Sequence, residues 1–290
     1  MPSFRADRIA SLYFFHPLQR LRAQQTRIPI LMYHSISDSD DSSRHPYYRT
    51  STTPKMFDRQ IRFLHQNGYR TVGVTEASRL MRSAHPNEKD AGAGKLVGIT
   101  FDDGYQDFHT NAFPILNRYG YSATVFLPTA YIGQASRQFK GAECLTWSQV
   151  LDLRKAGVGF GSHTVTHPQL RGVSSEQMRT EVGRSKDEIE EKLGERVEAF
   201  AYPYAFPETD RTFVETLHRA LQESGYQSGV TTVIGRAGCP DDPLFMRRLP
   251  VNSDDDPHLL QAKLEGGYDW LRTAQYAAKL RTADRVPAKR

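Results

Sequence analysis

Two short segments of this 290-residue chain carry side chains that could bind a metal ion and move a proton. In residues 100–104 the adjacent carboxylates of Asp102 and Asp103 leave an apolar run at a glycine turn. Further along, His163 and His167 are four residues apart, so one helical turn would place both imidazoles on one face. Two His and one Asp are a sufficient ligand set for a catalytic metal that keeps positions open for water.

A third segment, residues 200–205, is an aromatic and proline turn. Its functional interpretation is the wall of a sugar-binding groove formed by Tyr202, Pro203 and Tyr204, with a backbone N–H aimed at a developing oxyanion. Its structural interpretation is a packed loop. Likewise, a lone Asp-Asp-Gly is usually a plain turn, and a lone His pair is usually incidental. The combination of the three segments at strand ends is what favours a catalytic site.

The elements that must position these side chains follow from the periodicity of apolar residues. Apolar runs predict strands at 28–34, 69–74, 95–101, 122–127, 158–161, 197–202 and 227–233, and helical spacing predicts helices at 55–66, 111–118, 147–155, 175–193 and 212–224. The strands lack clean polar alternation, so we expect an α/β fold with a parallel sheet covered by helices. About seven units in one run favour a distorted (β/α) barrel in a single domain, with its functional face at the carboxyl ends of the strands.

Composition, charge and cysteine content indicate the domain organisation and exclude some classes of partner and fold. The chain divides into an N-terminal extension at 1–27, one domain at 28–275 and a basic tail at 276–290. Its 38% hydrophobic content can fill a substantial core. The net charge of +5 is spread without a dense Lys/Arg block, so we expect no nucleic-acid partner. Cys144 and Cys239 are too few for a disulfide framework.

The N-terminal extension contains an apolar run, 10–15, that ends well below the length of a signal peptide or a membrane span. This predicts a cytoplasmic protein. Within 4–21, four apolar residues could share one face of a helix flanked by Arg residues, namely Ile9, Leu12, Tyr13 and Leu18. Such a stretch either packs against the barrel or makes peripheral contact with the inner face of an anionic membrane.

The three chemical segments, in this order, resemble the polysaccharide deacetylase family, also called the NodB homology domain family of carbohydrate esterases. The resemblance runs from about residue 28 to residue 251. It implies that Asp102 is the general base and Asp103 a metal ligand. His163 and His167 match the paired metal-binding histidines of the second motif. Tyr204 matches the residue whose backbone amide helps to hold the oxyanion.

The chain departs from the family pattern at two places. The third motif of the family usually carries an Arg two residues before its Pro, where this chain has Ala201. No clear match to the later His-bearing motif follows Tyr204. Residues 31–34 look like that late motif moved to the front, as in circularly permuted members that modify exopolysaccharides. This resemblance implies that His34 is the general acid, whereas its structural interpretation is a hydrogen-bonded histidine at a strand end.

Residues 245–251 resemble the closing strand of the permuted members. A base beside a metal needs an orienting partner, so we expect Arg248, or else Arg247, to reach the carboxylate of Asp102 in place of the missing Arg. The structural interpretation of these two Arg residues is surface charge.

The implied reaction is removal of acetyl groups from an N-acetylated amino-sugar polysaccharide or oligosaccharide by a water molecule that a divalent metal ion activates. Zinc is the expected ion, and mixed His/carboxylate ligation also accepts cobalt, nickel or iron. The expected partner is the acetylated saccharide, and exopolysaccharide biosynthesis the expected setting. The alternatives are an O-acetyl carbohydrate esterase, a non-catalytic carbohydrate-binding relative and a non-haem iron oxygenase. The sequence sets neither the polymer nor the oligomeric state.

Overall fold

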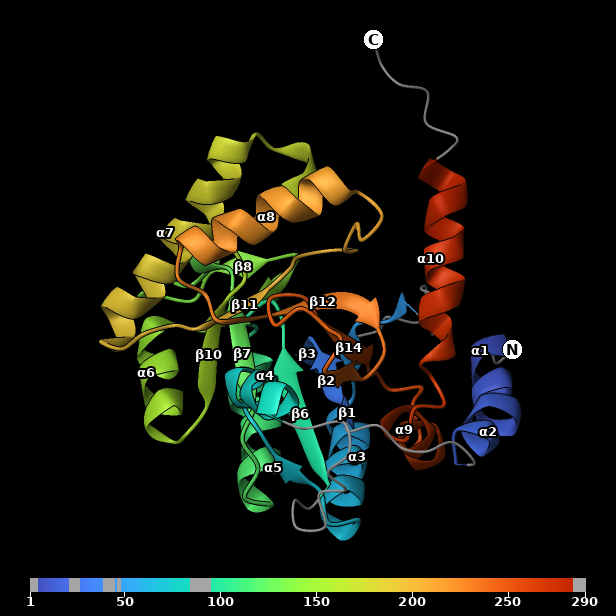
Figure 1. Cartoon of the computed structure of the whole chain (residues 1–290). Coiled ribbons are helices and arrows are strands. Elements are labelled where there is room, and N and C mark those ends of the chain that lie inside the picture. Colours follow the sequence, from blue (N-terminus) through green and yellow to red (C-terminus); the bar gives the residue numbers. More distant parts are fainter. Residues whose placement is uncertain (1–4, 21–26, 39–44, 46–47, 84–94, 284–290) are drawn as a thin grey trace.

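The structure, a computed structural model, describes residues 5–20, 27–38, 45, 48–83 and 95–283. Its centre is a closed ring of seven parallel strands that helices surround (Figure 1). In ring order the strands are β2 (Ile30–Tyr33), β14 (Met246–Pro250), β12 (Ser228–Ile234), β11 (Ala199–Ala201), β10 (Gly159–Ser162), β7 (Thr124–Leu127) and β6 (Leu96–Phe101). Pairing of β6 with β2 closes the ring. The expected distorted barrel of about seven parallel strands is confirmed.

The ring is distorted at β6. On the side of β6 that faces away from β2, two strands pair with it instead of one. β5 (Arg70–Thr71) pairs with its first residues and β7 with its last. The strand predicted at 69–74 is therefore a two-residue strand outside the ring, and α4 (Val74–Ser83) begins within its predicted range. The seventh ring strand is instead β14, which apolar periodicity had not indicated, since its centre holds two consecutive Arg residues.

The first ring strand in the chain lies between the last and the second. Leu31 of β2 pairs with Leu249 of β14, and Ile30 pairs with Gly98 of β6. A strand moved from the end of the chain to its front would take this place. As a result, the carboxyl ends of β14, β2 and β6 are neighbours, although more than 200 residues separate β2 from β14 in the sequence.

Helices cover the outside of the ring. The predicted helices are confirmed as α3 (Pro54–Gln66), α5 (Phe113–Arg118), α6 (Trp147–Lys155), α7 (Ser175–Leu193) and α8 (Arg211–Glu223). A side chain caps the amino end of four of them and accepts a hydrogen bond from the backbone N–H three residues on: Thr53, Thr146, Ser174 and Asp210. Two further helices, α9 (Pro257–Leu264) and α10 (Trp270–Ala283), were not predicted.

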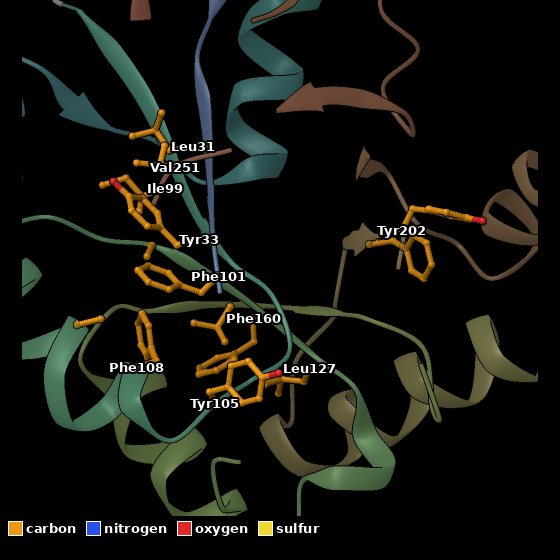
Figure 2. Packing of buried hydrophobic residues seen from close by; sticks show 14 of the residues in the cluster. Leu31, Tyr33, Ile99, Phe101, Tyr105, Phe108, Leu127, Phe160, Tyr202 and Val251 are labelled. Carbon is orange, nitrogen blue, oxygen red and sulfur yellow. The ribbon is translucent and has the colours of Figure 1, made fainter. Parts of the chain in front are cut away.

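An aromatic layer packs between the ring and α3. Tyr33 of β2 and Phe101 of β6 stack with their ring centroids 5.4 Å apart, and Phe101 meets Phe108 edge-on at 4.8 Å. Figure 2 shows these three side chains together. Because successive side chains of a strand point to opposite faces, the next residues, His34 and Asp102, are directed away from this layer toward the mouth of the barrel.

The interior of the ring is filled by aliphatic side chains and one phenylalanine. Phe126 is fully buried there, and a Cβ atom added at Gly161 of the neighbouring strand would lie 2.5 Å from its ring. Only glycine leaves that space open. Below it, Val74, Ala77 and Met81 of α4 belong to the same buried cluster as Phe126.

Three pairs of short strands lie outside the ring: β1 (Arg27–Ile28) with β13 (Ala237–Gly238), β3 (Ser35–Ile36) with β4 (Ser51–Thr52), and β8 (Gln138–Phe139) with β9 (Ala142–Glu143). Residues 39–44, between β3 and β4, and residues 84–94, between α4 and β6, lie outside the described residues. Within the N-terminal extension, α1 (Ala6–Ala10), a π-helical turn (Ser11–Phe15) and α2 (His16–Arg20) form one continuous helix. Among the described residues, no helix combines the length and apolarity needed to cross a membrane.

Candidate active site

The two adjacent carboxylates leave β6 in a tight left-handed turn. The N–H of Asp102 donates to the carbonyl of Tyr33, which carries the β6–β2 pairing one residue past the strand. Asp103 (φ +70°) and Gly104 (φ +60°) are both left-handed, a conformation that Asp tolerates better than most residues and glycine adopts freely. Both carboxylates are only 2% exposed, and they face different partners.

Asp102 is held by an arginine from the last ring strand. Arg248 donates to both carboxylate oxygens, at 2.7 Å and 2.8 Å, and also to the carbonyl of Thr231 and the hydroxyl of Thr100. Burial alone would raise the pKa of Asp102, but the Arg248 guanidinium outweighs it and holds the pKa below its ordinary value. The carboxylate is therefore ionised and fixed in orientation. Arg247 points elsewhere and pairs with Asp241 at 2.8 Å.

The His-bearing segment after β10 is an irregular loop, so the helical turn considered from its spacing does not form. Thr164 (φ +70°) and His167 (φ +57°) are left-handed, and these two reversals bring the histidines together. Glu181 of α7 fixes the loop, since its carboxylate accepts from the N–H groups of Val165 and Thr166 at 2.9 Å and 2.8 Å. The four-residue spacing of His163 and His167 therefore belongs to an irregular backbone turn that the buried Glu181 stabilises.

Asp103, His163 and His167 converge at one point. Their ligand atoms lie within 4.8 Å of one another, and an Asp103 oxygen is 3.6 Å from Nε2 of His163 and 3.2 Å from Nε2 of His167. Nδ1 of His163 lies 2.8 Å from the carbonyl of Ala201, to which it can only donate, so Nε2 keeps its lone pair. Burial lowers the pKa of His163 to about 4, which leaves the imidazole neutral.

This donor set fits a divalent cation. The carboxylate of Asp103 and the lone pair of His163 converge on the same point. Burial alone would raise the pKa of Asp103, but the hydrogen bond with His167 and nearby positive charge outweigh burial and lower the pKa. Nδ1 of His167 is buried and has no hydrogen-bond partner among the described residues. A carboxylate and two imidazoles are also the ligand types that zinc and related ions accept. Asp103, His163 and His167 would hold the ion.

A lysine from a hairpin occupies the open side of Asp103. Lys140 and Gly141 form the left-handed turn between β8 and β9, with φ angles of +50° and +83°. The ammonium of Lys140 lies 3.4 Å and 3.2 Å from the two carboxylate oxygens of Asp103. Its side chain is 40% exposed, so it can move away into solvent. A metal ion bound at Asp103 would have to compete with Lys140 for the same carboxylate.

Aromatic rings surround this point. Phe139 meets His167 at 5.1 Å, Tyr204 meets His167 at 4.6 Å, and Tyr131 packs on Phe139 at 4.2 Å. Tyr204 is 44% exposed and left-handed (φ +62°), and its N–H donates no hydrogen bond to the described part of the chain. An oxyanion donor needs a backbone N–H without another partner, and Tyr204 offers one on a residue whose ring contacts His167.

Tyr202 and Pro203 were expected on the wall of a groove, but both are buried. The ring of Tyr202 packs edge-on against Phe206 at 5.0 Å and Phe213 at 6.0 Å, which makes it a core residue. In Figure 2 it lies well apart from Tyr33 and Phe101. Of the three residues expected to line the groove, only Tyr204 presents its ring to solvent.

His34 lies next to the base at the end of β2. Its Nε2 is 4.0 Å from an Asp102 oxygen, and its side chain is 21% exposed, so one edge of the ring faces the opening. Burial lowers the pKa of His34 from its ordinary value, and the charges of Asp102 and Asp103 oppose that shift. The imidazole therefore lies beside Asp102 and is partly open to solvent.

Sequence reasoning missed Lys140 and Glu181. Glu181 had a signal: it interrupts the apolar stripe of α7 formed by Met178, Val182 and Ile189, so it was bound to be buried and to need partners. Lys140 precedes a glycine between two very short strands, a pattern too weak to mark a hairpin.

With this geometry in place, the chain can be compared with known proteins. Residues 89–228 match the model of the polysaccharide deacetylase family. YxkH of Bacillus subtilis, which its name assigns to the same family, is 34% identical over 227 residues, which cover 78% of this chain and 72% of YxkH. This chain belongs to the polysaccharide deacetylase family. The family assignment made from the motifs is thus confirmed, and the chain is a deacetylase, a hydrolase of amide bonds other than peptide bonds.

Two further deacetylases span most of the chain. A poly-β-1,6-N-acetyl-D-glucosamine N-deacetylase of Staphylococcus epidermidis is 26% identical over 254 residues, covering 81% of this chain and 83% of that protein. The structure of the Streptococcus pyogenes deacetylase PplD, in complex with acetate, superposes with a TM-score of 0.71 at 28% identity and covers 83% of this chain and 99% of its own. The family match at 89–228 includes both carboxylates and both histidines, whereas His34 and Arg248 lie outside it.

Proposed function

We propose that this deacetylase removes N-acetyl groups from an N-acetylglucosamine-containing polysaccharide or oligosaccharide, such as an exopolysaccharide, and that it requires one divalent metal ion, with zinc as the expected ion. The observation that carries the proposal is the pair of buried carboxylates at one mouth of the barrel. Asp102 faces Arg248 and is free to accept a proton, while Asp103 faces His163 and His167. The name of the staphylococcal relative supports an amino-sugar polymer as substrate.

The roles follow from what each group contacts. When bound, a divalent ion supplies a Lewis acid for the acetyl carbonyl and lowers the pKa of a water molecule. Asp102 takes the proton of the attacking water as general base, because Arg248 keeps it ionised and in place. The N–H of Tyr204 donates to the oxygen of the tetrahedral intermediate. His34 delivers a proton to the departing amine nitrogen, which leaves poorly without one.

The test is acetate release from two substrates by the same protein. Oligomers of N-acetylglucosamine carry amide acetyl groups, and acetylated xylo-oligosaccharides carry ester acetyl groups. We expect release from the first and its loss in Asp102→Asn, whereas His218→Ala, a histidine on α8 that pairs with Asp242, keeps wild-type activity. Release from the ester alone would replace the proposal with an O-acetyl esterase. Release from neither would contradict the proposed substrate class.

A further inference from the structure

The helix at residues 6–20 exposes an unusual number of large apolar side chains. Nine such side chains are exposed in the described part of the chain, and four of them lie within ten residues of this helix: Ile9 (41% exposed), Tyr13 (72%), Phe14 (62%) and Leu18 (53%). Scattered exposed apolar residues are normal on a protein surface, but a contiguous set marks an interaction site.

These side chains form one continuous face. Between residues 5 and 19, every residue classed as exposed is apolar: Ala6, Ile9, Tyr13, Phe14, Pro17 and Leu18. Their spacing of three to five residues is that of one side of a helix. We call this set the apolar face.

The opposite side of the helix is anchored, which fixes the apolar face outward. Trp270 of α10 donates to the hydroxyl of Ser11 at 3.0 Å and stacks on Phe15 with ring centroids 4.8 Å apart. Arg8 pairs with Asp256 at 2.6 Å, at the start of α9. The helix therefore cannot turn its apolar face onto the barrel without breaking its contacts with Trp270 and Asp256.

Formal charge separates the two ends of the chain from its middle. Residues 1–27 carry five Arg and one Asp, a net +4, and residues 270–290 carry six Lys or Arg and one Asp, a net +5. Since the whole chain is +5, residues 28–269 carry 5 − 4 − 5 = −4. The N-terminal helix contacts the start of α10 through Trp270, and both helices lie at one flank of the barrel (Figure 1).

We propose that the apolar face is a peripheral docking surface for an anionic lipid bilayer. Tyr13, Phe14, Ile9 and Leu18 enter the boundary between headgroups and acyl chains, and the net positive charge of the two end segments of the sequence favours an anionic surface. Aromatic side chains are typical of that boundary. A second copy of the chain is a poor occupant, because pairing the same face would bring two basic ends, each of +9, together.

The experiment is co-sedimentation of the full chain with vesicles. One set contains phosphatidylglycerol in phosphatidylcholine, and the other phosphatidylcholine alone. The variant Ile9→Gln/Tyr13→Gln/Phe14→Gln/Leu18→Gln removes the apolar face without changing charge, and Leu80→Gln/Leu151→Gln is a matched control with exposed leucines on α4 and α6. We expect wild type and control to bind the anionic vesicles, the variant to bind at least about tenfold more weakly, and binding to fall with added salt.

Three results would overturn the proposal: equal binding by wild type and variant, no binding by wild type, or equal binding to both kinds of vesicle. Light scattering supplies a fourth result: a wild type that is dimeric and a variant that is monomeric would assign the apolar face to a second copy of the chain. If the quadruple variant does not fold, Tyr13→Gln replaces it. Tyr13 is the most exposed of the four, and a loss of several-fold is expected.

Discussion

Arg248 and Asp102 form a two-pronged ion pair across 146 positions of sequence, with hydrogen bonds of 2.7 Å and 2.8 Å. Arg248 is fully buried and Asp102 2% exposed, so the pair is shielded from bulk solvent. Planar guanidinium and carboxylate groups matched in this way fix orientation as well as charge. The pair places on β14 the arginine that the family usually carries two residues before the Pro of its third motif, where this chain has Ala201.

Arg248→Met should therefore impair the base and the fold. Without the guanidinium, burial raises the pKa of Asp102, so the acid limb of the activity profile moves to higher pH. We expect kcat to fall about 10²-fold, with KM changed little, and stability to fall by about 3–5 kcal/mol, because a buried charge loses its partner. Arg248→Lys should restore part of kcat, and Arg247→Met should leave the profile unchanged. An unshifted acid limb in folded Arg248→Met would refute the role of the pair.

Replacing His34 with Ala should separate amide from ester hydrolysis. We expect unchanged metal content and a fall in kcat of about 10²- to 10⁴-fold on an N-acetyl substrate, with loss of the alkaline limb. In the wild type that limb should lie below the pH typical of an exposed histidine, because burial lowers the pKa of His34. An ester with a good leaving group needs no proton donor and should lose much less. Equal losses on both substrates, or loss of the metal, would make His34 a ligand or a structural residue.

Removing Lys140 should strengthen metal binding. Its ammonium occupies Asp103, so an incoming ion must displace it. We expect Lys140→Met to bind zinc about three- to tenfold more tightly in a chelator competition, since a partly exposed ion pair is worth little more than that. Lys155→Met is the control, as that lysine is on α6 and pairs with Asp152. Equal affinities in all three proteins would show that Lys140 does not compete.

Gly161→Ala should destabilise the barrel. The added methyl would lie 2.5 Å from the ring of Phe126, and the close-packed interior leaves that ring little room to retreat. The expected loss in the free energy of unfolding is about 1–3 kcal/mol by urea titration. Gly172→Ala, where no atom lies within 4 Å of the added Cβ, is the control. A loss below that of the control would mean that the interior is loosely packed.

The sequence was most informative where one local pattern determines structure. Apolar spacing gave α3, α6 and α7 nearly at their observed bounds, and the structure shows Thr53, Thr146 and Ser174 capping their amino ends. The carboxylates and histidines could be placed at strand ends because the strands before them are apolar.

What could not be predicted depends on contacts between distant segments. Apolar periodicity missed β14 because Arg247 and Arg248 sit inside it, and only the resemblance to the permuted members indicated a strand there and an arginine at Asp102. The spacing of the two histidines suggested a helical turn. No residue near them in sequence indicates that Glu181 of α7 accepts hydrogen bonds from the N–H groups of this loop. Lys140 reaches Asp103 only after the hairpin has folded over the site.

The central claim is metal-dependent deacetylation at Asp103, His163 and His167, and the most direct measurement is acetate release during metal reconstitution. Protein stripped by a chelator is titrated with zinc while acetate release from N-acetylglucosamine oligomers and bound metal are both followed. We predict no release from the stripped protein, a rise that saturates near one zinc per chain, and neither binding nor release at those zinc levels in His163→Ala or His167→Ala. Full release from metal-free protein, or wild-type metal binding by both histidine variants, would contradict the account.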